Sequence, residues 1–101
     1  AMTIKPDREY YPLLKSDRVV GDVSSLPEAQ RLYTAWRNAA QRAARKSIAL
    51  AYGGNDFTEL ERLNAAVERA HAELEVYLRK ELSLPEGTRL KIKEGWKVVM
   101  A

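Results

Sequence analysis

The sequence predicts a mainly α-helical protein: one long antiparallel helical hairpin with an extended N-terminal arm and a C-terminal β-hairpin. Three observations support this fold class. Two long segments repeat apolar residues at the three- and four-residue spacing of bundle helices. The pair Gly53-Gly54 separates them, and glycine readily ends a helix. The last residues of the chain alternate polar and apolar side chains, which is the period of a β-strand.

Length and composition limit the chain to one small domain, residues 1–101. Because the chain has no cysteine, it has no disulfide framework, thiolate metal site or cysteine nucleophile. No apolar run approaches the roughly 18 residues that a membrane helix needs, and no signal peptide opens the chain. We therefore expect a cytoplasmic protein that does not associate with a membrane.

Residues 1–24 contain two prolines and show no helical period, so we predict an extended arm. Its last part, Val19-Val20-Gly21-Asp22-Val23, favours a short strand over about residues 18–23. Because the arm carries several apolar residues, we expect it to lie against the rest of the protein.

The helical hairpin is predicted over residues 25–82, with its first helix at about 26–52. Ser25 is placed to accept the free N–H groups of the first turn, Pro27 suits the first helical position, and Glu28 complements the positive helix end. On a helical wheel the apolar residues gather on one side. They are Ala29, Leu32, Tyr33, Trp36, Ala40, Ala43, Ser47, Leu50 and Ala51.

The second helix is predicted over about residues 55–82, capped by Asn55 or Asp56. Thr58 and Glu61 have the spacing of a capping box, which is the alternative start. The short glycine connection makes the two helices antiparallel neighbours. The apolar stripe of the second helix comprises Leu60, Leu63, Val67, Ala70, Leu74, Tyr77 and Leu78.

The tail, residues 83–101, predicts a β-hairpin over about 88–100. A three-residue loop, Lys93-Glu94-Gly95, would pair Ile92 with Trp96 and keep the apolar side chains on one face. A two-residue Glu94-Gly95 loop would mix polar and apolar side chains, so we prefer the longer loop. The expected apolar face holds Leu90, Ile92, Trp96, Val98 and Met100, and the polar face holds Arg89, Lys91 and Lys97. A lone hairpin is marginal in water, so this face must cover the helices or be joined by the 18–23 strand.

The net charge of +3 hides an uneven distribution. Residues 26–54 carry five basic side chains against one acidic, whereas residues 55–82 carry seven acidic against four basic. Two helices that attract each other explain this pattern, and so does a basic surface for a polyanion. The candidate nucleic-acid-binding residues on the first helix and the tail are Arg31, Arg42, Arg45, Lys46, Lys91 and Lys97.

Catalytic and metal-binding motifs find little support in the sequence. Glu68 and His71 have the Glu-x-x-His spacing seen in di-metal helical bundles, but Glu68 lies toward solvent on the wheel. The first helix also offers no inward glutamate. No serine sits in a nucleophile elbow, and Gly53-Gly54 lacks the lysine and further glycine of a phosphate loop. We expect no enzyme activity, no metal and no cofactor.

The supply of apolar surface points to self-association. The apolar arc of the first helix spans about half of its circumference, which is more than one partner helix covers. The second helix adds an outer stripe of small and apolar residues. A second copy would complete a four-helix bundle across a two-fold axis, so a dimer is favoured. The candidate interface residues are Leu32, Trp36, Ala43, Leu50, Ala65, Ala72 and Val76.

The sequence therefore favours a non-catalytic helical protein–protein interaction module that self-associates. Such a module would act as an adaptor, an assembly factor or an inhibitor of a larger complex. Its small size and lack of motifs are also compatible with a phage or mobile-element protein. The alternative function is a small nucleic-acid-binding protein that uses the basic face of the first helix and the basic tail.

Overall fold

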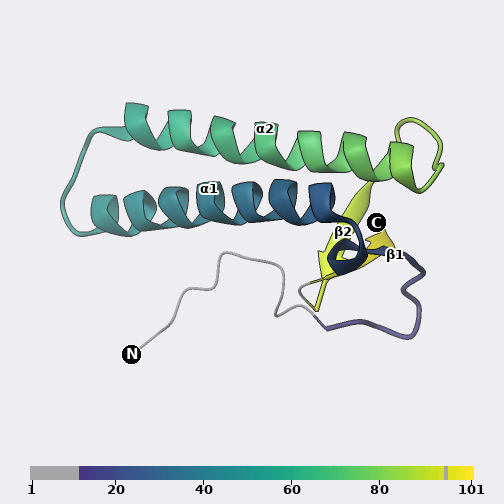
Figure 1. The fold of residues 1–101 in the computed structure, drawn as a ribbon. Coiled ribbons are helices and arrows are strands. Elements are labelled where there is room, and N and C mark those ends of the chain that lie inside the picture. The colour runs from purple at the N-terminus through teal and green to yellow at the C-terminus, as the bar shows by residue number, and fades with distance from the viewer. Residues whose placement is uncertain (1–11, 95) are drawn as a thin grey trace.

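The computed structural model describes residues 12–94 and 96–101. It has the predicted architecture: two long antiparallel helices lie side by side, and a small sheet packs at one end of the pair (Figure 1). The first eleven residues of the predicted arm lie outside the described residues. In chain order the elements are β1 (Val19–Asp22), η1 (Val23–Ser25), α1 (Pro27–Ala51), α2 (Phe57–Glu81), β2 (Leu90–Lys93) and β3 (Lys97–Met100).

The start of α1 differs in detail from the prediction. Pro27 occupies the first turn as expected, but the cap residue is Leu26, which offers no side-chain hydrogen bond. Ser25 belongs to the 3-10 turn η1, and its hydroxyl donates to the carbonyl of Asp22 at 2.9 Å. The Ser25 cap was therefore wrong, because the short turn between β1 and α1 uses that side chain.

The connection between the helices follows the predicted signals. Gly53 has a φ of 129°, a backbone conformation that side-chain-bearing residues rarely adopt. At the start of α2, the carboxylate of Asp56 accepts the N–H of Thr58 at 3.2 Å, so Asp56 is the cap. Arg79 and Lys80 lie in the last turn, where cations complement the negative helix end.

The sheet has three antiparallel strands in the order β1-β3-β2, so the segment predicted at 18–23 does join the hairpin. The pairing of β1 with β3 is irregular between Val19 and Gly21. At Gly21 an added Cβ would stand 2.8 Å from a methyl group of Leu82, so this strand passes close to the end of α2. Glycine permits that close approach.

The register of the β-hairpin is not the predicted one. Lys93 pairs with Lys97 and Ile92 with Val98, so the loop runs over residues 94–96 and Trp96 lies within it. The predicted pairing of Ile92 with Trp96 was therefore wrong. Within this loop, the backbone of Glu94 is in the left-handed region, with a φ of 54°. The observed loop lies one residue further along the chain than the predicted one, so each residue of β2 pairs with a β3 residue two positions further on. Because side chains alternate with a period of two, the side chains in the strands stay on the predicted faces.

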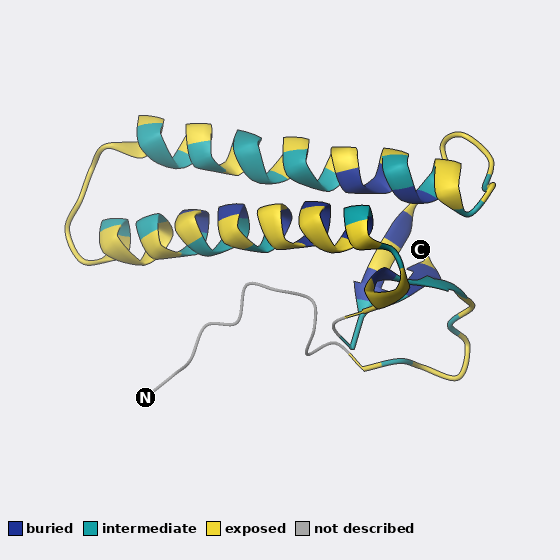
Figure 2. Ribbon diagram, viewed as in Figure 1, coloured by how far each residue is buried: buried dark blue, intermediate teal, exposed yellow. Residues whose placement is uncertain are grey.

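The core lies where the sheet meets the two helices, and it is confined to that end of the molecule. Leu74 and Leu78 of α2 and Val98 of β3 are at most 1% exposed. Figure 2 shows the buried positions near the sheet and exposed or half-buried positions toward the helix connection. The buried cluster comprises Val23, Ala29, Leu32, Tyr33, Trp36, Leu74, Leu78, Leu90, Ile92 and Val98.

Candidate interaction surfaces

Within residues 12–94 and 96–101, no sheet or further helix covers the half of the hairpin next to the helix connection, residues 40–67. In the helices, no residue of α1 after Ala43 and none of α2 before Leu74 is buried. Ile48 is 37% exposed, and Phe57 at the start of α2 is 54% exposed. We call this part of the molecule the distal half. Among the described elements, the two helices pack on each other here, and Ile48 and Phe57 remain exposed.

A shallow groove of about 240 Å³ runs between the helices of the distal half. The α1 side of the groove is formed by small residues, so the two backbones leave a furrow there. The α2 side contributes larger apolar residues and one amide. The lining residues are Ala40, Ala43, Ala44, Ser47, Leu60, Asn64 and Val67.

A second groove of about 460 Å³ shares Val67 with the first and continues toward the sheet. Its walls include Trp36, His71, Glu75 and Arg89. The Trp36 and His71 rings have centroids 5.0 Å apart and are tilted by 55°. The two grooves together therefore follow one side of the hairpin from the distal half to the sheet.

Glu75 is a buried carboxylate at the sheet end of this second groove, only 8% exposed. One of its oxygens accepts the backbone N–H of Leu90 at 2.9 Å and lies 3.5 Å from Nε of Arg89. The other lies 3.7 Å from Nδ1 of His71 and 4.0 Å from Arg79. Buried carboxylates need such partners. The arrangement attaches the first residue of β2 to α2.

The predicted oligomer-interface residues differ in how far they are exposed. Leu32, Trp36 and Ala43 are 8%, 7% and 6% exposed within a single chain, so they are not accessible to a second copy. Leu32 and Trp36 share the buried cluster with Leu90, Ile92 and Val98 of the sheet, whereas Ala43 is buried outside that cluster. Leu50 and Ala65 are half-buried.

The remaining predicted interface residues lie on the outer side of α2. Ala72 is exposed and Val76 is 56% exposed. They line a further shallow depression of about 430 Å³ with Glu73, Tyr77 and Lys80. Val76 is the only large apolar side chain exposed within α2 after its first residue, Phe57, whereas the distal half exposes Ile48 and Phe57.

Some of the candidate nucleic-acid-binding residues form ion pairs with acidic residues, and others are exposed. Arg31 forms an ion pair with Glu28, which raises the pKa of the Arg31 guanidinium. Glu73 on α2 raises it further, so Arg31 takes part in attraction between the helices. Lys97 lies 3.3 Å from Glu94. Arg42, Arg45 and Lys91 are exposed and Lys46 is half-buried, but the helix residues and the strand residues do not form one stripe.

The segment before β1 is attached to the β-hairpin by charge. Lys93 forms an ion pair of 2.7 Å with Asp17, and both side chains are largely buried. This contact and the Leu14 N–H lower the pKa of Asp17. A carboxylate oxygen of Glu94 accepts the N–H of Leu13 at 3.1 Å, and that bond, together with Lys97, lowers the pKa of Glu94. The sequence carries no signal for these long-range pairs.

Trp96 and Met100 do not lie where the predicted apolar face places them, since Met100 is 37% exposed and Trp96 more so. Trp96 was expected on the apolar face with Leu90 and Ile92, but it is 49% exposed at the tip of the hairpin. Its carbonyl oxygen accepts the N–H of Val23 at 2.8 Å, so the backbone at this point is attached to η1. For Trp96, the register shift described above is the cause.

Neither a metal site nor a membrane helix is found in the described part of the chain. No group of three or more His, Asp or Glu residues there is arranged to hold a metal ion. Of the helices described, none combines the length and the apolar character needed to cross a bilayer.

The fold defines the class of this protein, a helical hairpin with a small terminal sheet. Comparison with known proteins does not assign it to a particular family. Protein-family models, curated proteins and solved structures were all compared with the chain, and none of them matches. Function must therefore be argued from the chain itself.

Proposed function

We propose that this protein is a non-catalytic helical interaction module that self-associates through the distal half of its hairpin. The observation that supports this proposal is the gradient of burial along the helices. The sheet covers one end, whereas the other end exposes Ile48 and Phe57 and leaves Leu50, Leu60 and Leu63 half-buried. Larger exposed apolar patches are typical of protein–protein contacts.

A second copy of the chain is the occupant that fits this surface best. Two helices cannot enclose a core alone, whereas four can, and facing distal halves would complete a four-helix layer. Charge supports the same partner. The α1 segment is basic and the α2 segment acidic, so α1 of one copy over α2 of the other brings opposite charges together. We expect the dimer to form at micromolar concentration, because only the few exposed apolar side chains of the distal half would be buried.

Light scattering coupled to size exclusion tests the proposal directly. At about 100 µM, a concentration above the micromolar Kd of a small interface, the protein should show twice its chain mass of 11.5 kDa. The double variant Ile48→Glu, Phe57→Glu should be monomeric, because it buries two carboxylates in the proposed contact. Both positions are exposed in the single chain, so the variant should keep its helical circular dichroism spectrum.

Val76→Glu is the matched control, since it introduces the same charge at an exposed apolar helix position outside the distal half. It should remain dimeric. A strictly monomeric wild type would refute self-association. A dimer that is lost in Val76→Glu but retained in the double variant would place the interface on the outer stripe of α2 instead.

A further inference from the structure

The sheet end of the molecule combines an exposed tryptophan with an excess of positive charge. We propose that this end, centred on Trp96, is a contact surface for single-stranded nucleic acid. The bases would stack on the indole, and the surrounding lysines would attract the phosphates. This surface is separate from the distal half of the hairpin, and the proposal does not depend on self-association.

The backbone of Trp96 is hydrogen-bonded to η1, whereas its side chain is about half exposed to water. Its carbonyl accepts the N–H of Val23 at 2.8 Å, and the flanking residues Lys93 and Lys97 are paired across the hairpin. The side chain nevertheless remains 49% exposed, whereas Trp36 is 7% exposed. A large aromatic ring has few rotatable bonds to fix on contact, and a half-exposed indole presents a face on which a base can stack.

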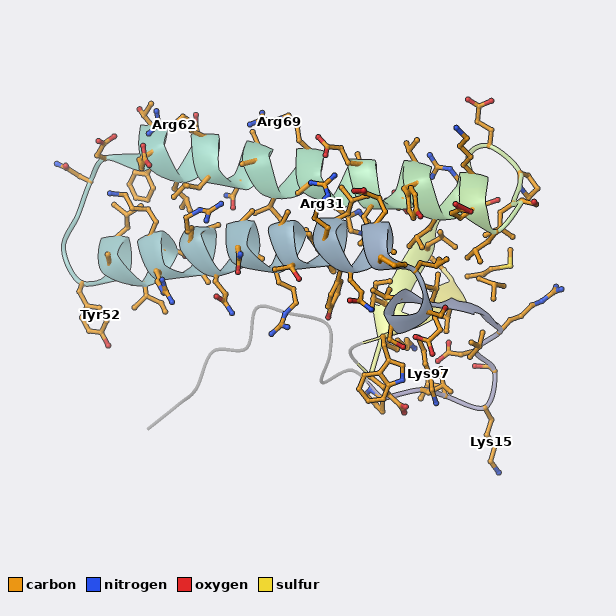
Figure 3. All side chains as sticks on the ribbon, in the orientation of Figure 1. Lys15, Arg31, Tyr52, Arg62, Arg69 and Lys97 are labelled. Atoms are coloured by element: carbon orange, nitrogen blue, oxygen red, sulfur yellow. The ribbon has the colours of Figure 1, made fainter. Side chains whose placement is uncertain are left out.

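Positive charge is concentrated at the same end. Residues 12–22 and 88–101 carry six basic side chains against three acidic, whereas the helical residues 27–81 carry nine against eight. Figure 3 shows Lys15 and Lys97 at the sheet end, away from the two helices. The helix pair therefore contributes little net attraction for a polyanion, and the sheet end contributes most of it.

Lysines lie on the sheet face opposite to the one that carries the core residues of β2. Lys91 and Lys93 share that face with Val99, because the opposite face carries Leu90 and Ile92. Val99 is fully buried, so the cations stand around a covered centre. Lys93 and Lys97 are partly neutralised by Asp17 and Glu94, and Lys91 is close enough to Asp17 to lower its pKa. The exposed cations of this end are Lys15, Arg18, Lys91 and Arg89, and Arg89 lies 3.5 Å from the carboxylate of Glu75 on α2, which partly neutralises it.

Single strands fit this surface better than duplexes do. Every base presents a π-face to an aromatic side chain once it is unpaired, and no hydrogen-bond code is needed. Duplex readers instead place a helix or a β-ribbon in the major groove, and here both long helices are occupied with each other. Salt-dependent binding without sequence preference is therefore expected.

Fluorescence anisotropy of a labelled twelve-nucleotide oligothymidylate, titrated with the full chain, tests the proposal. Binding should weaken about 20-fold between 50 and 200 mM salt if about three phosphates are contacted. Trp96→Ala should lower the affinity at least tenfold, and Trp96→Phe should retain most of it, because phenylalanine still stacks. Lys91→Glu should also lower the affinity about tenfold.

Arg45→Glu is the control for charge, because it makes the same change at an exposed position on α1 far from the sheet. It should bind like the wild type. The proposal is overturned if no anisotropy change occurs at low salt and about 100 µM protein. It is equally overturned if Trp96→Ala binds as the wild type does, or if Arg45→Glu loses binding and Lys91→Glu does not. Vesicles of anionic lipid that shift the Trp96 fluorescence, without oligonucleotide binding, would assign the surface to membranes instead.

Discussion

Replacing Glu75 with alanine should loosen the attachment of the sheet to α2. The carboxylate accepts the N–H of Leu90, the first residue of β2, and lies within 4.0 Å of Arg79 and Arg89. Alanine removes the acceptor from a buried N–H and leaves no carboxylate near the two guanidinium groups. The substitution affects the contact between α2 and β2, and the buried core lies between these elements.

The expected loss follows from the geometry. A hydrogen bond to a buried charged acceptor contributes about 1.5–3 kcal/mol, including the cost of leaving the donor unpaired. The Arg89 side chain is 74% exposed, so its ion pair adds little. Arg79 keeps a partner, because it donates to the carbonyl of Thr88 at 3.0 Å. We therefore expect Glu75→Ala to lower the free energy of unfolding by about 2–3 kcal/mol.

Urea denaturation followed by circular dichroism measures this loss, which corresponds to about 8–20 °C in Tm for a chain of this length. Glu75→Gln should cost only about 1 kcal/mol, because its amide oxygen can still accept the Leu90 N–H. Hydrogen exchange of the Leu90 amide should accelerate in the alanine variant. Glu73→Ala, an exposed neighbour on α2, should stay within about 0.5 kcal/mol of wild type.

The reasoning is refuted if Glu75→Ala unfolds within about 0.5 kcal/mol of the wild type, which is the usual range for surface substitutions. It is also refuted if the glutamine and alanine variants are equally unstable, since the shared acceptor would then be irrelevant. In either case apolar packing alone would attach the sheet to the helices.

Two further predictions concern packing and acid stability. Leu74→Ala should cost about 3–4 kcal/mol in urea denaturation, and Leu60→Ala about 1–2 kcal/mol, because Leu74 is 1% exposed and Leu60 is half-buried in the distal half. Equal losses would contradict the burial gradient. The ion pair with Lys93 lowers the pKa of Asp17, and the Leu13 N–H lowers the pKa of Glu94, so their contribution to stability is present at neutral pH and lost as the pH falls through the lowered pKa values. In thermal melts, the double variant Asp17→Asn, Glu94→Gln should be less stable than the wild type at pH 7, and the difference should shrink as the pH falls; a difference that stays constant into acid would exclude the ionic origin.

Much of the fold follows from local patterns. The apolar spacing predicted both helices to within one or two residues of Pro27–Ala51 and Phe57–Glu81, because helix periodicity and glycine termination act over a few residues. The Asp56 cap is equally local. The short strand before α1 was also predicted, as a run of β-branched residues.

Contacts between distant segments could not be predicted from the sequence, for a physical reason. The hairpin register was wrong because a loop moved by one residue shifts each pair by two positions. The side chains that remain in the strands keep their faces, so face patterning cannot distinguish the two loops. Trp96 changed from a core residue to an exposed one through that shift. The contacts Asp17–Lys93 and Glu75–Leu90 join segments far apart in the chain, and no local pattern encodes them.

The sequence by itself determined the two helices, their antiparallel arrangement, the strand segments and the uneven charge, since all of these arise from spacing along the chain. Only the tertiary structure decided which apolar residues remain accessible. The sheet covers Leu32 and Trp36 at one end of the hairpin and leaves Ile48 and Phe57 uncovered at the other. Coverage depends on where a distant segment packs, and that is set by the mutual fit of surfaces rather than by the period of any one of them.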